Sequence, residues 1–214
     1  MKNYTDLNII LDRSGSMEGI HKDMEGGIKT FLEKERGTKD KTKVSLFKFD
    51  DVYEVEFVDK DIKDPIDIKI VSRGTTSLLD AIGKTIASVG EKLVTMHEDD
   101  RPNRVLFFIV TDGFENSSRE YKLEQVKHLI KLQRETYAWD FVFLGTTEEV
   151  MAQHVDLGIG WASTVMSGAT GQSINTAFAA MTDSYQDYKK LDRNDVSTRR
   201  QTFNTRTVRD ENEE

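Results

Sequence analysis

The stretch from Val105 to Val110, VLFFIV, is a run of six apolar residues without a polar interruption. A strand with one solvent-facing side alternates apolar and polar residues, so an unbroken apolar run predicts a strand covered on both faces. Strands of this kind lie at the centre of a parallel sheet. The next residues, Thr111-Asp112-Gly113-Phe114, favour a turn and end the strand.

Short apolar runs alternate with longer amphipathic stretches on both sides of this strand. The pattern predicts an α/β fold: a Rossmann-like, doubly wound sheet of about six strands, mostly parallel, with helices on both faces. We expect further strands at Leu7–Leu11, Val44–Phe49 and Phe141–Leu144, and a weaker one near Trp161–Val165. Val52–Val58 follows an Asp50-Asp51 turn and is expected to be the one antiparallel edge strand. Apolar residues at helical spacing predict helices over Met17–Glu35, Leu78–Met96, Leu123–Leu132, Glu148–Val155 and Gln172–Tyr188.

Composition limits the classes of protein that this chain can represent. The 214 residues carry a net charge of -8, which argues against binding nucleic acid through its phosphates. The absence of cysteine excludes disulfides, thiolate zinc sites and a cysteine nucleophile. No apolar segment reaches the roughly 18 residues of a membrane span, and the N-terminus does not resemble a signal peptide, so we expect a cytoplasmic protein without membrane contact. We expect one domain over residues 1–191 and a flexible charged tail over 192–214, where apolar residues become rare.

Three loops carry oxygen-bearing side chains where ligands bind in open α/β sheets, beyond the carboxyl ends of the strands. Asp12-Arg13-Ser14-Gly15-Ser16 follows the first strand, Gly74-Thr75-Thr76-Ser77 precedes the second helix, and Asp112 follows the central strand. Alternate residues of an extended loop face the same way, so Asp12, Ser14 and Ser16 are expected to converge. If the first strand lies beside the central strand, Asp112 joins them.

Carboxylates and hydroxyls without imidazole or thiolate are hard-oxygen ligands, which suit Mg²⁺, Mn²⁺ or Ca²⁺. Each piece also has a simpler interpretation. The serines and either threonine can cap helices, and Asp-Gly is a common turn. The occurrence of all three loops in the expected places favours metal binding. A cation held mainly by hydroxyls would keep affinity for one further anionic oxygen from outside.

The motif resembles the metal-ion-dependent adhesion site of von Willebrand factor A domains, written D-x-S-x-S, then T, then D. The matching residues are Asp12, Ser14 and Ser16, then Thr76, then Asp112; Thr76 is preferred to Thr75 because of the family-like run T-S-L-L-D-A-I. LDRSGSM, SLLDAIG, TDGFENSS and FVFLG are similar to stretches in stand-alone intracellular A domains of bacteria and phages. The resemblance implies that the hydroxyls contact the metal and that the aspartates often act through water.

The resemblance implies a protein-binding module that captures an Asp or Glu side chain of a protein partner, with Mg²⁺ as the first choice of cation and Mn²⁺ or Ca²⁺ as alternatives. The residues show no recognisable catalytic constellation, so we expect no enzymatic activity. Two alternatives remain: a Mg²⁺-dependent hydrolase or phosphoryl-transfer enzyme using Glu115 or His21, and an assembly protein whose metal only rigidifies the loop. Side chains that we expect to form the rim around the metal are Arg13, Glu18, His21, Arg73, Phe114, Glu115 and Asn116.

Overall fold

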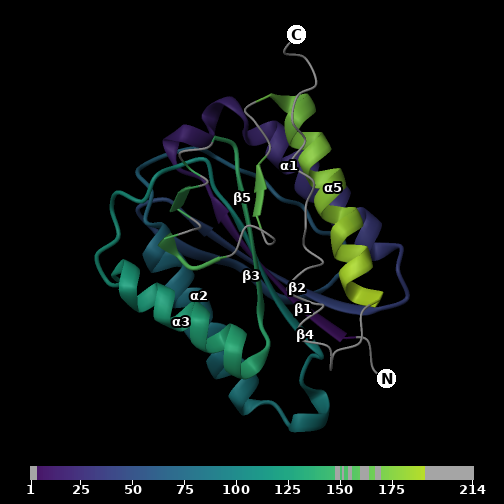
Figure 1. Cartoon of the computed structure of the whole chain (residues 1–214). Coiled ribbons are helices and arrows are strands. Elements are labelled where there is room, and N and C mark those ends of the chain that lie inside the picture. Colours follow the sequence, from purple (N-terminus) through teal and green to yellow (C-terminus); the bar gives the residue numbers. More distant parts are fainter. Residues whose placement is uncertain are drawn as a thin grey trace.

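The computed structural model describes residues 4–147, 150, 152–153, 156–159, 164–166 and 170–190. Within these residues the chain forms a six-stranded sheet with helices on both faces (Figure 1). The strands are β1 Tyr4–Asp12, β2 Lys41–Phe49, β3 Tyr53–Asp61, β4 Arg104–Val110, β5 Asp140–Gly145 and β6 Thr164–Met166. The helices are η1 Gly15–Gly19, α1 His21–Arg36, α2 Leu78–Thr95, η2 Glu98–Asp100, α3 Leu123–Tyr137 and α5 Gly171–Lys190, where η marks a 3₁₀ helix.

The strand order is β3-β2-β1-β4-β5-β6, and every neighbouring pair except β2 and β3 is parallel. The predicted α/β class, strand number and antiparallel edge strand are therefore confirmed. The VLFFIV run lies in β4, between β1 and β5, and all seven residues of β4 are buried. Because β1 and β4 are parallel neighbours, with Leu11 paired to Val110, the loops that follow them leave the sheet side by side.

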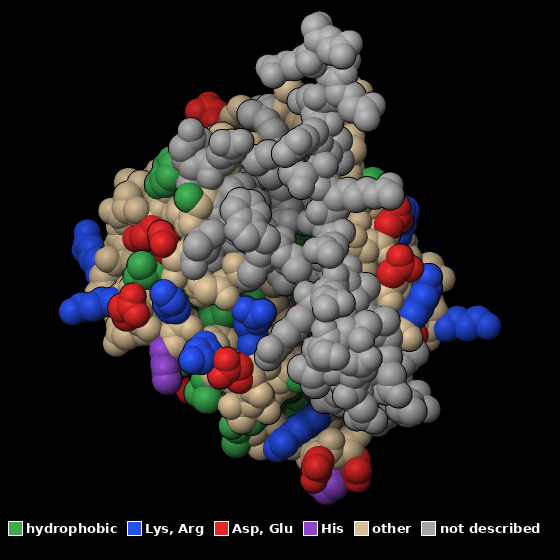
Figure 2. Space-filling view, in the orientation of Figure 1, with side chains coloured by type: hydrophobic (Ala, Val, Ile, Leu, Met, Phe, Trp, Pro, Cys, Tyr) green, Lys and Arg blue, Asp and Glu red, His purple; other side chains and the backbone are tan. Residues whose placement is uncertain are grey.

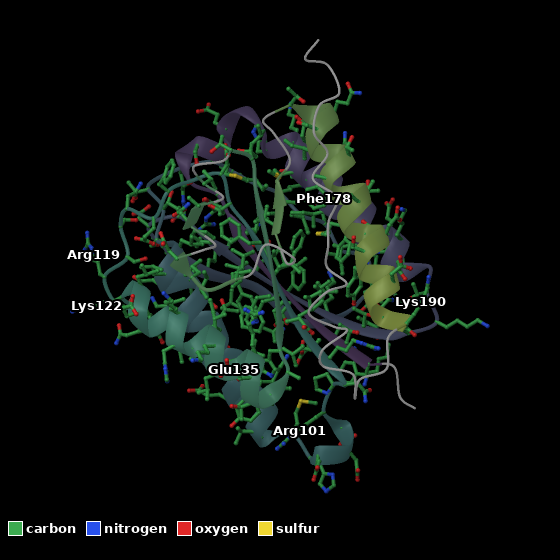
Figure 3. All side chains as sticks on the ribbon, viewed as in Figure 1. Arg101, Arg119, Lys122, Glu135, Phe178 and Lys190 are labelled. Carbon is green, nitrogen blue, oxygen red and sulfur yellow. The ribbon has the colours of Figure 1, made fainter. Side chains whose placement is uncertain are left out.

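Helices α1 and α5 cover one face of the sheet, and α2 and α3 cover the other (Figure 1). On the first face Phe178 of α5 meets the ring of Phe108 edge-on, at 5.9 Å between centroids, and lies between α5 and the sheet (Figure 3). Phe178 also packs against the bare backbone of Gly27 in α1; a β-carbon built there would lie 2.1 Å from its ring. The two helices are therefore packed too closely for any side chain at position 27.

The chain after β1 differs from the prediction of one helix from Met17. It first forms η1, whose turns are closed by Met17 N donating to Ser14 O (3.0 Å) and Ile20 N donating to Met17 O (3.1 Å). Helix α1 begins only at His21. Ser14 directly precedes these tighter turns and Ser16 lies within them, so the regular helix starts only after the segment that presents both hydroxyls.

The expected helix over Glu148–Val155 lies largely outside the described residues, as does the tail from 192 onward. In the described part of the chain, no helix has both the length and the apolar composition needed to cross a bilayer. On the face seen in Figure 2, Lys and Arg side chains are interspersed with Asp and Glu side chains over the described surface. That part of the surface therefore offers no broad region of a single charge.

Candidate metal centre

The first carboxylate of the candidate site ends strand β1. Asp12 is completely buried, and its two oxygens are both held. Oδ1 accepts a hydrogen bond from the backbone N–H of Ser14 (2.6 Å), and Oδ2 accepts one from Thr111 Oγ1 (2.6 Å). Thr111 directly follows β4, so this bond joins the ends of the two central strands. The carboxylate is thereby fixed before any ligand binds.

The hydroxyls come from two other loops. Ser14 is buried and Ser16 is exposed, and their Oγ atoms lie 3.0 Å apart. Thr76 is buried, whereas Thr75 beside it is exposed. The backbone of Thr76 is held by Asn116: its N–H donates to Asn116 Oδ1 (3.0 Å), and its carbonyl accepts from Asn116 N (3.0 Å).

Gly113 shows how closely these groups converge. A β-carbon built on Gly113 would lie 2.5 Å from Thr76 Oγ1, 3.0 Å from Ser14 Oγ and 3.1 Å from Asp12 Oδ2. Oxygens from two loops that are distant in sequence therefore converge on Gly113, which lies on the third loop. Any residue larger than glycine at position 113 would occupy the space between them.

Asp112 supplies the second carboxylate, and its surroundings favour a cation. Burial, and after it the negative charge of Asp12, raises the pKa of Asp112 to about 6. Burial also raises the pKa of Asp12, although hydrogen bonds from Thr111 and Ser14 act in the opposite direction. The Oδ1 atom of Asp112 is buried and has no hydrogen-bond partner among the described residues. A buried acceptor without a donor is costly, and a bound cation would satisfy it.

The donor set therefore fits a hard divalent cation. Among the described residues, no group of three or more His, Cys, Asp or Glu side chains could hold a metal, so an ion here would depend on hydroxyls beside two carboxylates. Oxygen-only donors suit Mg²⁺, Mn²⁺ or Ca²⁺. The two carboxylates carry no more negative charge than is needed to balance a divalent cation. A cation that keeps coordination positions open can then bind a further anionic oxygen.

The predicted rim residues fall into two groups. Glu18 and Arg73 are exposed and His21 is partly exposed, with Nδ1 2.6 Å from the carbonyl of Glu18. Phe114 is 50% exposed, so it does not pack into the core beneath the loop. Glu18, His21, Arg73 and Phe114 are accessible to a partner.

The other three rim candidates make internal bonds. Arg13 is buried and ion-paired with Asp50 and Glu54. Glu115 accepts hydrogen bonds from the N–H groups of Leu79, Ser117 and Ser118, and from Ser118 Oγ. Asn116 has an exposed surface, but its side chain holds Thr76. These residues build the loops that carry the site.

Sequence reasoning assigned no role at the site to Thr111, Asp50 or Gln153. Gln153 donates from Nε2 to the carbonyl of Gly113 (3.0 Å), and its Oε1 accepts from the N–H of Glu115 (2.8 Å), so its amide holds the backbone on both sides of Phe114. Thr111 could have been identified from the sequence, because its hydroxyl directly follows a buried strand and precedes the candidate ligand Asp112. The turn composition around Asp50 gave no indication that its carboxylate is buried.

Solved structures with the same architecture include one whose description names a metal site. Proximal thread matrix protein 1 from the mussel byssus, with a zinc-occupied MIDAS motif, matches with a TM-score of 0.61 and 14% identity over 84% of this chain and 45% of that chain. The ArnB paralog VWA2 of Sulfolobus acidocaldarius matches with a TM-score of 0.53 and 14% identity over 85% of this chain and 45% of that chain. The fold is that of a von Willebrand factor A domain.

BatB of Bacteroides thetaiotaomicron has the same A-domain fold, with a TM-score of 0.56 and 15% identity over 86% of this chain and 98% of that chain. The present chain spans less than half the length of the mussel and Sulfolobus proteins. No protein-family model and no curated protein matches the sequence. The likeness at these identities concerns the A-domain fold, and the chemistry of the site depends on the residues of this chain.

Proposed function

We propose that this A domain is a divalent-metal-dependent protein-binding module. Asp12, Ser14, Ser16, Thr76 and Asp112 would hold the cation, directly or through water, with Mg²⁺ as the first choice and Mn²⁺ or Ca²⁺ as alternatives. The observation that carries the proposal is the buried Oδ1 of Asp112, which has no hydrogen-bond partner in the described part of the chain, directly before Gly113, where oxygens of Asp12, Ser14 and Thr76 converge. The zinc-occupied MIDAS described for the mussel protein supports it.

A bound cation would supply a positively charged coordination position for a carboxylate oxygen of a protein partner. The chain itself contributes accessible side chains around that position. Arg73 is a cation with a 55% exposed side chain, and Phe114 is an exposed aromatic ring. Arginine and aromatic side chains, phenylalanine included, are enriched at protein–protein interfaces. We propose that the partner presents an Asp or Glu residue to this surface.

The proposal includes no catalytic role. An enzyme at this metal would need a free general base, and Glu115 and His21 are the candidates beside the loops. Glu115 is occupied by hydrogen bonds to Leu79, Ser117 and Ser118, and Nδ1 of His21 lies against the carbonyl of Glu18. These contacts favour binding over catalysis. The cytoplasmic location and the similarity to bacterial and phage A domains stay predictions.

An array of immobilised peptides tests the proposal. Each peptide containing Asp or Glu is paired with a copy containing Asn or Gln, and the wild type is applied with Mg²⁺ or with EDTA. We expect binding to a subset of acidic peptides, lost in their amide copies, in EDTA and in Asp112→Asn. Peptides retained equally in EDTA would contradict a metal-dependent module and favour an assembly role. Phosphoester turnover that is lost in Asp112→Asn would favour the enzyme.

A further inference from the structure

Asp50 lies in the turn between β2 and β3, and its side chain is completely buried. Two arginines from different loops donate to the same oxygen of this carboxylate. Arg13 Nε lies 2.8 Å from Asp50 Oδ2, and Arg73 Nε lies 2.7 Å from the same atom. The other oxygen, Oδ1, accepts the N–H of Val52 (2.6 Å). Charge-assisted bonds of this length are among the stronger hydrogen bonds in proteins.

The two arginines flank the candidate metal ligands in sequence. Arg13 directly precedes Ser14, and Arg73 lies three residues before Thr76. The carbonyl of Asp50 also accepts the N–H of Ser77 (2.9 Å) and a hydrogen bond from the Ser77 hydroxyl. Asp50 is therefore bonded to residues next to Ser14 and Thr76, although it lies on neither of their loops.

Backbone bonds connect the same two loops directly. Arg73 N donates to the carbonyl of Arg13 (2.8 Å), and Gly15 N donates to the carbonyl of Gly74 (3.2 Å). Gly74 has a positive φ of 68°, and a β-carbon there would lie 2.1 Å from Asp51 Oδ1. Ser14 is thus fixed on both sides against the loop that leads to Thr76. The position of one hydroxyl depends on the position of the other.

We propose that Asp50 is a positioning residue for the metal centre, acting through Arg13 and Arg73. The inference rests on the proposed metal site and adds a residue that does not touch the cation. With Asp50 in place, the serine and threonine hydroxyls are held at the spacing that a cation requires. Without it, the two loops can separate, and each hydroxyl would have to be ordered by the ion itself. Metal affinity should therefore fall while the fold persists.

The alternative explanation is that Asp50, Arg13 and Arg73 affect the cation only through their charges. A substitution of Arg73 distinguishes this explanation from the positioning role. Its side chain is 55% exposed, so Arg73→Gln should leave the fold intact. Removing a cation near a divalent ion would tighten binding through charge alone. Loss of the bond to Asp50 would weaken binding through positioning. The sign of the change in affinity distinguishes the two explanations.

The test is titration calorimetry of Mn²⁺ into EDTA-treated wild type, Asp50→Asn, Arg73→Gln and Glu54→Gln, with unfolding of each metal-free protein followed by circular dichroism. Glu54 is the control because it pairs with Arg13 from the exposed side, at 47% exposure. We expect about tenfold weaker binding for Asp50→Asn, at least threefold weaker binding for Arg73→Gln, and a change below twofold for Glu54→Gln.

Wild-type affinity in both Asp50→Asn and Arg73→Gln, or tighter binding in Arg73→Gln, would overturn the positioning role and leave the proposed function intact. If Asp50→Asn does not fold, Arg73→Gln decides alone. A wild type that binds no Mn²⁺ would overturn the proposed function and this inference with it. Weaker binding in both variants, with wild-type behaviour in Glu54→Gln, would support the inference.

Discussion

Asp12 and Asp112 stand at the ends of adjacent strands, and burial together with the charge of Asp12 raises the pKa of Asp112 to about 6. In the unfolded chain the pKa of Asp112 returns to its ordinary value of 3.8, so the folded protein binds this proton more tightly than the unfolded chain. The contribution of Asp112 to stability is then most favourable below about pH 4 and is lost as the pH rises through about 6.

Asp112→Asn should therefore stabilise the metal-free protein at neutral pH. We expect a gain on the order of 1 kcal/mol at pH 7, less than the full shift implies because Asp112 is partly exposed, and a gain near zero at pH 4. Urea unfolding in EDTA at several pH values measures it. Asp67→Asn is the matched control, since its side chain is 79% exposed. A gain that does not change with pH would refute the raised pKa of Asp112.

Thr75 and Thr76 offer adjacent hydroxyls in different environments. Thr76 Oγ1 faces the cluster around Gly113, whereas Thr75 is exposed. We expect Thr76→Ala to weaken Mg²⁺ binding at least about tenfold, a loss of about 1.4 kcal/mol, and Thr75→Ala to leave it unchanged. Titration calorimetry compares the two variants. A larger loss of affinity for Thr75→Ala than for Thr76→Ala would mean that the threonine was assigned in the wrong register.

Gly113→Ala would place a methyl group among the oxygens of Thr76, Ser14 and Asp12. Because those side chains must move apart, we expect metal binding to be lost and the metal-free protein to be destabilised by about 1–3 kcal/mol. Chemical unfolding and Mn²⁺ titration measure the two effects. Gly90→Ala is the control, since a β-carbon there would meet nothing within 4 Å. Wild-type metal affinity in Gly113→Ala would show that the ion binds elsewhere.

Gly26 and Gly27 are consecutive in α1 but face different surroundings. A β-carbon at Gly27 would collide with the ring of Phe178, while one at Gly26 would meet nothing within 4 Å. Gly27→Ala should cost about 1–3 kcal/mol through overpacking between α1 and α5. Gly26→Ala should stabilise the protein by up to about 1 kcal/mol, because alanine favours helix. Thermal unfolding that ranked the two variants in the opposite order would contradict the packing of these helices.

The sheet could be predicted because its signals are local. The unbroken VLFFIV run identified β4, and the alternation and turn residues around Asp50 identified the antiparallel edge strand. The convergence of Asp12 and Asp112 followed from placing two parallel strands side by side. Each of these inferences needed only a short stretch of sequence and a general rule of α/β topology.

The remaining features depend on partners that are distant in sequence. Arg13 was expected at the rim, but its partner Asp50 is 37 residues away and holds it inside. Thr111 bonds to Asp12 across 99 residues. No local pattern specifies such pairs, because the same Asp50-Asp51 dipeptide would form an acceptable exposed turn. The sequence therefore indicated the candidate ligands and missed the residues that we propose position them.

The central claim is that oxygens from three loops bind one divalent cation. A crystal structure of the protein grown with MnCl₂, with data collected for anomalous scattering by manganese, tests it most directly. We predict one anomalous peak next to the oxygens of Ser14, Ser16 and Thr76, with Asp12 and Asp112 directed towards it. Density without a peak at this place, with Asp112 turned away from Asp12, would contradict the claim.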